Sequence, residues 1–126
     1  PDVVSFLRTV KPVENIVAVT DALLPTGQKT GPFLANGEAV VFEGGVWKRE
    51  SDRVIAGSAL TMPRAFKNLV DFGFTLPQAV CCTSANAARL QGLAKRGRLE
   101  EGAEADLVLL NASFEPQAVF LRGQKI

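Results

Sequence analysis

The sequence predicts a mixed α/β fold, because it combines one buried strand, two hairpin turns and several amphipathic helices. Residues 16–20 (Ile-Val-Ala-Val-Thr) form a continuous apolar run, which is typical of a strand buried on both faces in a parallel sheet. The dipeptides Asn36-Gly37 and Gly44-Gly45 favour tight turns between antiparallel strands. Residues 33–50 are therefore expected to form a small β-meander, in which Trp47 is half buried.

Helices are predicted on both sides of these strands. Residues 1–11 have helical periodicity and end at Pro12. The apolar face of that helix is made of Val3, Val4, Leu7 and Val10.

Two further helices are predicted in the middle of the chain. The first has Pro63 near its start and Gly73 as its C-terminal stop. The second begins at Thr75, the first residue of a capping-box pattern with proline in the first turn. Residues 84–90 are predicted to form a separate short helix.

The remaining segments are predicted as a loop and a pair of strands. Residues 54–60 (Val-Ile-Ala-Gly-Ser-Ala-Leu) are expected to form a loop with small residues at its centre. Residues 105–110 and 118–121 are expected to form strands that return to a sheet. A parallel-type strand needs neighbours, and no segment besides residues 16–20 has that signature. The sequence thus suggests that an N-terminal portion of the fold lies outside this chain.

Composition argues against two classes of partner. The 126 residues include 14 basic and 13 acidic side chains, which are interspersed and give a formal net charge of +1. Nucleic-acid binding needs a concentrated basic face. The densest basic segment, residues 95–98, is followed at once by glutamates, which is typical of a solvated loop. No apolar run reaches the roughly 20 residues of a membrane span. Neither nucleic acid nor membrane is a predicted partner.

The two cysteines, Cys81 and Cys82, are adjacent. Neighbouring cysteines rarely form a disulfide, because the bridge strains the peptide between them. At least one of them is expected to pack inside a helix as a small apolar residue. Without a disulfide framework or a signal-peptide pattern near Pro1, the chain is predicted to be cytoplasmic.

Histidine is absent from the sequence. Histidine is the commonest general acid–base and a usual ligand of catalytic zinc. The chain therefore cannot form a Ser-His-Asp triad, and no metal site is predicted within it.

Three positions could carry chemistry. Asp21 follows the predicted strand directly, where catalytic groups lie in (β/α)8 barrels, but position alone favours an Asx turn or a helix cap. Gly57 and Ser58 could let a ligand approach the backbone, or could belong to a plain loop with a serine helix cap. Asn86 could be a buried amide that orients a loop, but helix capping is the favoured interpretation.

A set of motifs connects these positions to a known family. The motifs are Val19-Thr20-Asp21-Ala22, Ala56-Gly57-Ser58-Ala59-Leu60-Thr61-Met62, Asn68-Leu69-Val70, Ala85-Asn86-Ala87-Ala88-Arg89-Leu90-Gln91-Gly92-Leu93, Gly97-Arg98-Leu99, Glu101-Gly102 and Ala105-Asp106-Leu107-Val108. With them the chain resembles the amidohydrolase superfamily from about residue 13 to residue 126. The C-terminal motifs are shared by many amidohydrolases, whereas the first two resemble the N-acetylglucosamine-6-phosphate deacetylases more specifically. One departure is alanine at position 87, where the superfamily often has proline.

The resemblance implies a particular kind of α/β fold, the C-terminal part of a (β/α)8 TIM barrel plus strands of the small β-sandwich domain. Residues 1–96 would supply the last barrel strand and its helices, with a β-meander insertion at about 32–50. Residues 97–126 would supply the C-terminal strands of the sandwich. The resemblance also implies a homodimer.

The resemblance further implies a metal-dependent hydrolase that removes the acetyl group from N-acetylglucosamine 6-phosphate, giving glucosamine 6-phosphate and acetate. A divalent metal, often zinc, activates water in such enzymes. Asp21 would take the proton from that water and deliver it to the departing amine. Ile55, Ala56 and Gly57 would contact the amino-sugar phosphate. The metal ligands would lie outside this chain, so the chain alone is expected to hold no metal and to be inactive.

Two alternatives stay open. The chain could belong to another amidohydrolase, such as a deaminase or a dihydroorotase-like enzyme, although the motif at residues 56–62 argues against this. It could also be a non-catalytic module that binds a sugar phosphate or associates with other chains.

Overall fold

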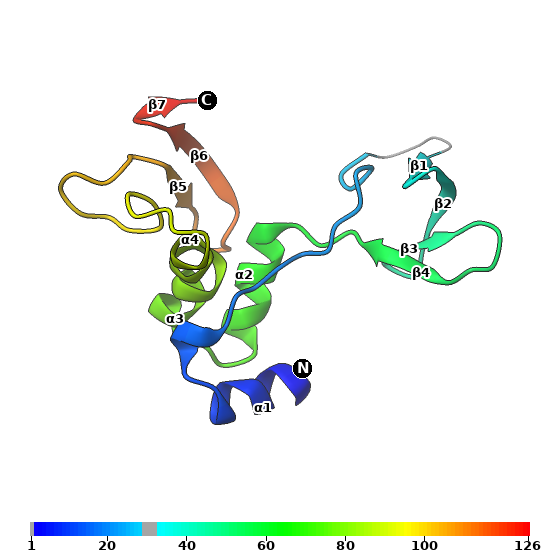
Figure 1. Ribbon diagram of the computed structural model, residues 1–126, viewed down its shortest axis with the longest axis horizontal. Helices are drawn as coiled ribbons and strands as arrows, with labels where there is room; N and C mark the ends of the chain where they lie inside the picture. Colours follow the sequence, from blue (N-terminus) through cyan, green and yellow to red (C-terminus); the bar gives the residue numbers. More distant parts are fainter. Residues whose placement is uncertain (1, 29–32) are drawn as a thin grey trace. The chain divides into compact units, whose positions relative to one another are not determined.

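The computed structural model describes residues 2–28 and 33–126, and it confirms a mixed α/β fold (Figure 1). The chain divides into two compact units. Thr20–Met62 form one, which we call the meander unit. The residues up to Val19 and Pro63–Ile126 form the other, which we call the helical unit.

The meander unit contains one antiparallel sheet with the strand order β1-β2-β3-β4. The antiparallel pairing predicted across residues 33–50 is present. Asn36-Gly37 and Gly44-Gly45 lie at the two turns, and all four residues have positive φ, as the tight turns of twisted hairpins require. The strands are β1 (Phe33–Ala35), β2 (Glu38–Glu43), β3 (Val46–Arg49) and β4 (Ile55–Ser58).

The predicted loop at residues 54–60 is wrong, because four of its residues form β4. This strand pairs with β3, with a register shift between Trp47 and Lys48. No hairpin motif follows Gly45 in the sequence, and the small residues of the segment do not have the pattern of a strand. The segment becomes a strand because it pairs with the outer edge of β3. Trp47 is also buried rather than half buried, with 3% of its surface exposed. The rings of Phe33 and Phe42 each lie 5.3 Å from its ring, which explains that burial.

The predicted strand at residues 16–20 is also wrong within the described part of the chain. Ile16 has extended backbone angles, but the segment joins no sheet. Ala18 instead donates a backbone hydrogen bond to Cys82, and Val19 is 74% exposed. A strand exists only against a neighbouring strand, so an apolar run alone cannot produce one. The first residue after the segment to pair is Ala22, in an isolated parallel bridge with Ser58.

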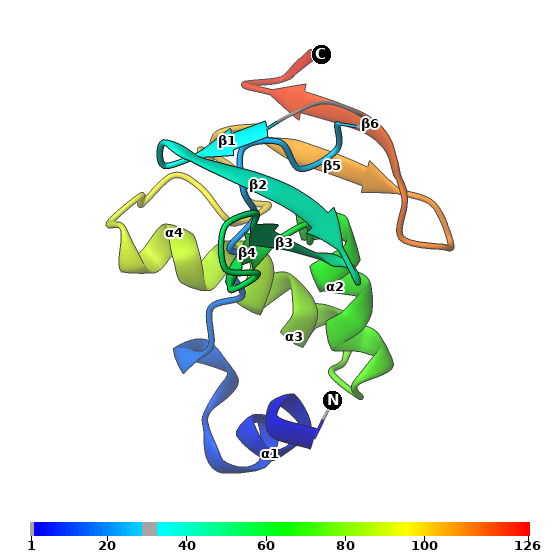
Figure 2. The same ribbon diagram turned by 90° about the vertical axis from the view of Figure 1, so that its right-hand side faces the viewer.

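The helical unit is built around α2 and a longer helical run. Gly73 lies at positive φ just after α2, as predicted. Thr75 forms the predicted capping box with Gln78. Residues 84–90 do not form a separate helix, because α3, η2 and α4 follow one another without a break (Figure 2). The helices are α1 (Asp2–Val10), the 3-10 turn η1 (Val13–Asn15), α2 (Met62–Asp71), α3 (Leu76–Val80), the π-helical η2 (Cys81–Ala85) and α4 (Asn86–Leu90).

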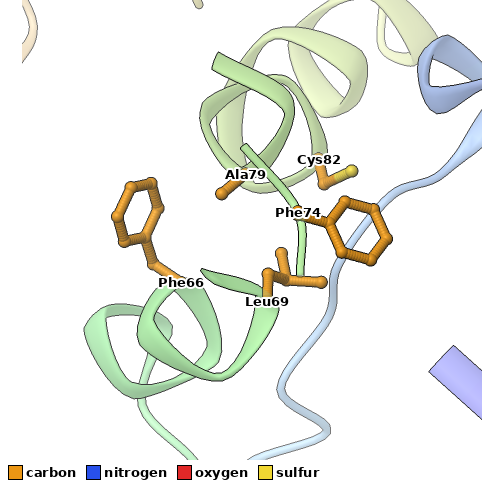
Figure 3. Packing of buried hydrophobic residues seen from close by; sticks show 5 residues of the cluster. All are labelled: Phe66, Leu69, Phe74, Ala79 and Cys82. Carbon is orange, nitrogen blue, oxygen red and sulfur yellow. The ribbon is translucent and has the colours of Figure 1, made fainter. Parts of the chain in front are cut away.

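The core of the helical unit lies between α2 and the α3–η2 run. Its buried side chains converge as Figure 3 shows, and Ile16 and Ala18 pack against them. Cys82 is fully buried among them, as expected for one of the two cysteines. The buried residues are Phe66, Leu69, Phe74, Ala79 and Cys82.

Two further features complete the description. The predicted C-terminal strands are present as β5 (Leu107–Leu110) and β6 (Pro116–Leu121), and β7 (Gln124–Lys125) extends them into a three-stranded sheet. On α1, Val4 packs against the core, whereas Val3 is 72% exposed, so the predicted apolar face is only partly buried. None of the helices that the structure describes is long and apolar enough to cross a bilayer.

Candidate functional site

The structure brings Asp21 and β4 side by side, although more than thirty residues separate them in the sequence. The backbone N–H of Ser58 donates to the carbonyl oxygen of Asp21 at 2.8 Å. The N–H of Leu23 donates in turn to the carbonyl oxygen of Ser58 at 3.1 Å. These two bonds are a short parallel ladder, so two of the three positions singled out from the sequence belong to one site.

Asp21 has an unusual backbone conformation at this point. Its φ is +49°, in the left-handed region that non-glycine residues rarely occupy, although Asp and Asn tolerate it best. The residue is exposed. Such conformations persist where the surrounding structure fixes them, and they are concentrated at functional sites.

Gly57 lies against the Asp21 segment so closely that no side chain fits there. A Cβ atom built on Gly57 would lie 2.7 Å from Leu23 Cδ2, 2.8 Å from Leu23 Cγ and 3.0 Å from the Asp21 carbonyl oxygen. The missing Cβ therefore allows β4 and the Asp21 segment to approach each other.

Two consecutive hydrogen bonds inside the meander unit connect β3 to β4 through Thr26. The Thr26 hydroxyl donates to the Ser58 carbonyl oxygen at 3.2 Å, and Trp47 Nε1 donates to that hydroxyl at 3.3 Å. Neither Thr26 nor Trp47 was predicted from the sequence to belong to the site. No short-range motif marks them, because their contact depends on the pairing of β3 with β4.

The other two predicted contact residues, Ile55 and Ala56, line a cavity of about 360 Å³ in the meander unit. Arg49 and Glu38 lie on the same cavity. Ile55 is exposed and Ala56 is partly buried, so both are accessible within this unit.

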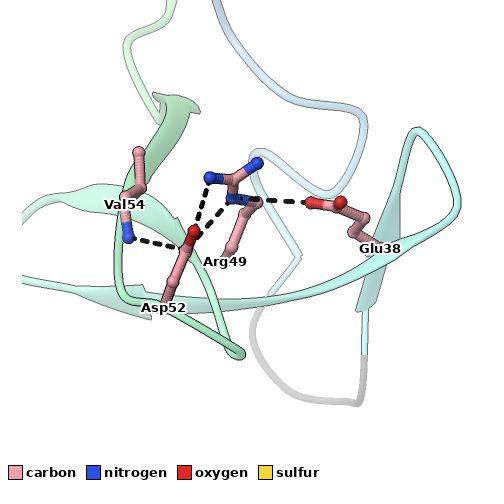
Figure 4. Close-up of polar contacts among 4 residues, drawn as sticks. All are labelled: Glu38, Arg49, Asp52 and Val54. Atoms are coloured by element: carbon pink, nitrogen blue, oxygen red, sulfur yellow. Dashed lines mark hydrogen bonds and ion pairs between the residues drawn. The ribbon is translucent and has the colours of Figure 1, made fainter.

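Arg49 is held in the ionic cluster drawn in Figure 4. Its Nε and Nη2 donate to both carboxylate oxygens of Asp52, at 3.1 and 2.5 Å, and its Nε lies 3.5 Å from Glu38. The Val54 N–H donates to Asp52 Oδ1 at 3.1 Å. The hydrogen bond from Arg49, supported by that from Val54, lowers the pKa of Asp52. The cluster ties the turn before β4 to β3.

Asn86 has a different role from the one favoured from the sequence. It lies inside the helical run and does not cap a helix. Its side chain is buried, and Nδ2 donates to the carbonyl oxygens of Val13 and Ile16, both at 2.8 Å. The favoured capping interpretation is therefore wrong, and the buried amide that orients a loop is the correct one.

Potential metal ligands are not clustered in the part of the chain that the structure covers. No group of three or more His, Cys, Asp or Glu side chains among the described residues is placed to hold a metal ion. Cys82 is buried, and burial, followed by the neighbouring Cys81, raises the pKa of its thiol.

Known proteins similar to this chain point to one enzyme. The N-acetylglucosamine-6-phosphate deacetylase of Lysinibacillus sphaericus is 35% identical over 110 residues, which cover 86% of this chain and 28% of that protein. The human protein of the same name is 28% identical over 115 residues, covering 90% of this chain and 28% of its own length. This chain therefore spans less than a third of the curated relatives it matches.

Solved structures show the same likeness. The N-acetylglucosamine-6-phosphate deacetylase of Thermotoga maritima matches with a TM-score of 0.89 and 33% identity, over 98% of this chain and 34% of that one. The Mycobacterium smegmatis enzyme, an aspartate-to-alanine variant in complex with N-acetyl-D-glucosamine-6-phosphate, matches with a TM-score of 0.90 and 29% identity, over 99% and 34%. The model of the amidohydrolase family matches residues 39–126, well over half of the chain. The chain therefore belongs to the amidohydrolase family.

Proposed function

We propose that the complete protein carrying this chain removes the acetyl group from N-acetylglucosamine 6-phosphate, giving glucosamine 6-phosphate and acetate. The observation that carries the proposal is the pairing of Asp21 with Gly57-Ser58. It joins in one site the two motifs that most resemble this enzyme. The similarity to deacetylases over 86–90% of the chain supports the same assignment.

Asp21 is the proton carrier in this proposal. Its exposed carboxylate accepts a proton from the attacking water and later donates it to the departing amine. One carboxylate can perform both transfers in sequence, so the chain needs no histidine for this role.

Substrate contact falls to Ile55, Ala56 and Gly57. The first two line the cavity of the meander unit, whereas Gly57 is buried and takes this role in the proposal through its backbone. Small residues suit a site in which backbone groups bind the oxygens of a sugar phosphate.

The rest of the proposal rests on the resemblance to the family. In it, the helices and the Asp21 segment are part of a (β/α)8 barrel, and β5–β7 are part of its small β-sandwich domain. In this proposal a divalent metal, zinc, would be held by residues outside this chain and would supply activation of water. The complete enzyme is a cytoplasmic homodimer.

The test is the deacetylation of N-acetylglucosamine 6-phosphate by the complete protein, with Asp21→Asn as the matched variant. Asparagine keeps the size and tolerates the backbone angle, but it cannot accept the proton. We expect acetate release by the wild type and a loss of about a thousandfold or more in kcat for the variant, with unchanged circular dichroism. An inactive wild type would overturn the proposed function. An active variant would overturn only the assignment of Asp21.

A further inference from the structure

The Ser58 side chain is attached to the Asp21 segment by a hydrogen bond of its own. Its hydroxyl donates to the carbonyl oxygen of Thr20, the residue before Asp21. The same oxygen accepts the backbone N–H of Leu60 at 3.0 Å. The hydroxyl is partly buried, and both of its hydrogen-bonding roles are used within the meander unit.

Ser58 therefore holds the peptide planes on both sides of Asp21. Its hydroxyl binds the carbonyl of the Thr20–Asp21 peptide, and its backbone N–H binds the carbonyl of the Asp21–Ala22 peptide. Peptide units are planar, so fixing the two planes that flank a residue fixes its φ and ψ. Those angles set the direction of the Cα–Cβ bond, from which the carboxylate extends.

These two hydrogen bonds constrain a residue whose backbone conformation is unfavourable. Asp21 has a φ of +49°, and left-handed backbone costs a non-glycine residue about 1–2 kcal/mol. Without the hydroxyl, the plane before Asp21 loses a partner and the residue can relax toward an ordinary conformation. The backbone bond from Ser58 to Asp21 would remain, so the segment would stay paired but would be less well oriented.

We propose that Ser58 is a positioning residue, whose hydroxyl holds the Asp21 carboxylate in the orientation needed for proton transfer. This inference rests on the proposed function of Asp21. It gives the hydroxyl no contact with the substrate. Its effect is therefore on turnover rather than on substrate binding, because misplacing a catalytic group raises the barrier of the chemical step.

The test compares Ser58→Thr with Ser58→Val in the complete enzyme. Threonine and valine have nearly the same shape and both suit a strand, but only threonine has a hydroxyl. We expect Ser58→Thr to keep kcat within about threefold of wild type. We expect Ser58→Val to lose about tenfold to a hundredfold in kcat, with KM changed by less than about twofold. Ser51→Ala, at an exposed serine of the same unit, is the matched control.

The set of outcomes distinguishes failure of the inference from failure of the proposed function. An inactive wild type would remove the function and the inference together. An active wild type with equal kcat in the two variants would overturn the inference alone. So would a loss in Ser58→Val that lies entirely in KM, because it would mark Ser58 as a substrate contact. Activities are normalised to the folded fraction measured by circular dichroism, so that a folding defect is not read as a loss of turnover.

Discussion

Gly57 and Leu23 approach each other so closely that a Cβ atom on Gly57 would lie 2.7 Å from Leu23 Cδ2. Gly57 has an ordinary φ, so space rather than backbone freedom requires glycine here. The closeness of β4 to the Asp21 segment depends on that absence of a side chain.

Gly57→Ala is expected to push the two segments apart. Crowding of this kind costs about 1–3 kcal/mol, so thermal unfolding of the complete protein should shift downward and activity should fall. Leu23→Ala removes the two nearest of the atoms that would clash, and the Asp21 carbonyl oxygen at 3.0 Å remains. A double-mutant cycle should therefore show that Leu23→Ala makes Gly57→Ala less harmful. Strictly additive effects would contradict the steric explanation.

Substitutions of Asp21 should distinguish the role of its carboxylate in catalysis from the effect of its positive φ on stability. Asp21→Asn is expected to leave stability nearly unchanged, whereas Asp21→Ala should destabilise by about 1 kcal/mol, because alanine tolerates positive φ poorly. Chemical denaturation of the two variants measures the difference. Equal stability would mean that the positive φ is not maintained in solution.

Asn86→Ala should destabilise the helical unit more than its volume change predicts. The substitution removes two 2.8 Å hydrogen bonds from a buried amide, at a cost of about 2 kcal/mol. Asn86→Asp should be worse, because a carboxylate cannot donate to the two carbonyl oxygens. Thermal unfolding is the measurement, with the exposed Gln91→Ala as the control. A neutral Asn86→Ala would rule out the buried-amide role.

The pairing of Asp52 with Arg49 predicts a pH dependence of the meander unit. The pKa of Asp52 is lowered in the fold, chiefly by the hydrogen bond from Arg49. Ionised Asp52 therefore stabilises the fold above the unfolded-state pKa, and this stabilisation is lost as the pH falls through the folded-state pKa. Amide exchange at Val54 should accelerate as the pH is lowered below about 4, relative to the intrinsic rate.

Asp52→Asn should weaken that acid response, and Glu50→Gln in the same turn should not. The variant should not abolish the response, because the pKa of Glu43 is also lowered, first by the hydrogen bond from Lys48. An identical pH profile in Asp52→Asn and the wild type would show that the pair is not formed in solution.

The two cysteines should differ in reactivity. The thiolate is the reactive form, and burial both hides the Cys82 thiol and raises its pKa. Alkylation followed by peptide mapping should modify Cys81 before Cys82 in the native protein and both alike after denaturation. Modification of Cys82 at the rate of a free thiol would contradict the observed packing.

The sequence was sufficient to predict the features that depend on a few neighbouring residues. The turn at Asn36-Gly37 and the capping box at Thr75 depend on a few neighbouring residues, and both are present. The same reasoning failed for residues 16–20 and for β4. Whether an extended segment becomes a strand depends on which edge lies beside it, and periodicity does not contain that information.

The sequence predicted several residues of the candidate site, but not the contacts that bring them together. Asp21 and Gly57 were identified from position and motif, and their roles stay predictions. Their contact, the hydrogen bonds of Ser58 and the support from Thr26 depend on pairing across the sheet. Asn86 was assigned to a cap because capping is the commonest role of asparagine near a helix start. Only its burial shows that it serves a distant loop.

The bond between Ser58 and Thr20 spans 38 positions of the sequence, which has a consequence for the order of folding. Closing a flexible loop of that length costs about 3 kcal/mol of chain entropy, whereas the three hairpins between these residues, β1–β2, β2–β3 and β3–β4, close over only a few positions. The hairpins can form first and shorten the effective loop before Thr20 and Ser58 meet. The geometry around Asp21 would then be among the last features of the meander unit to form. Slow formation of the turn at Asn36 would delay it.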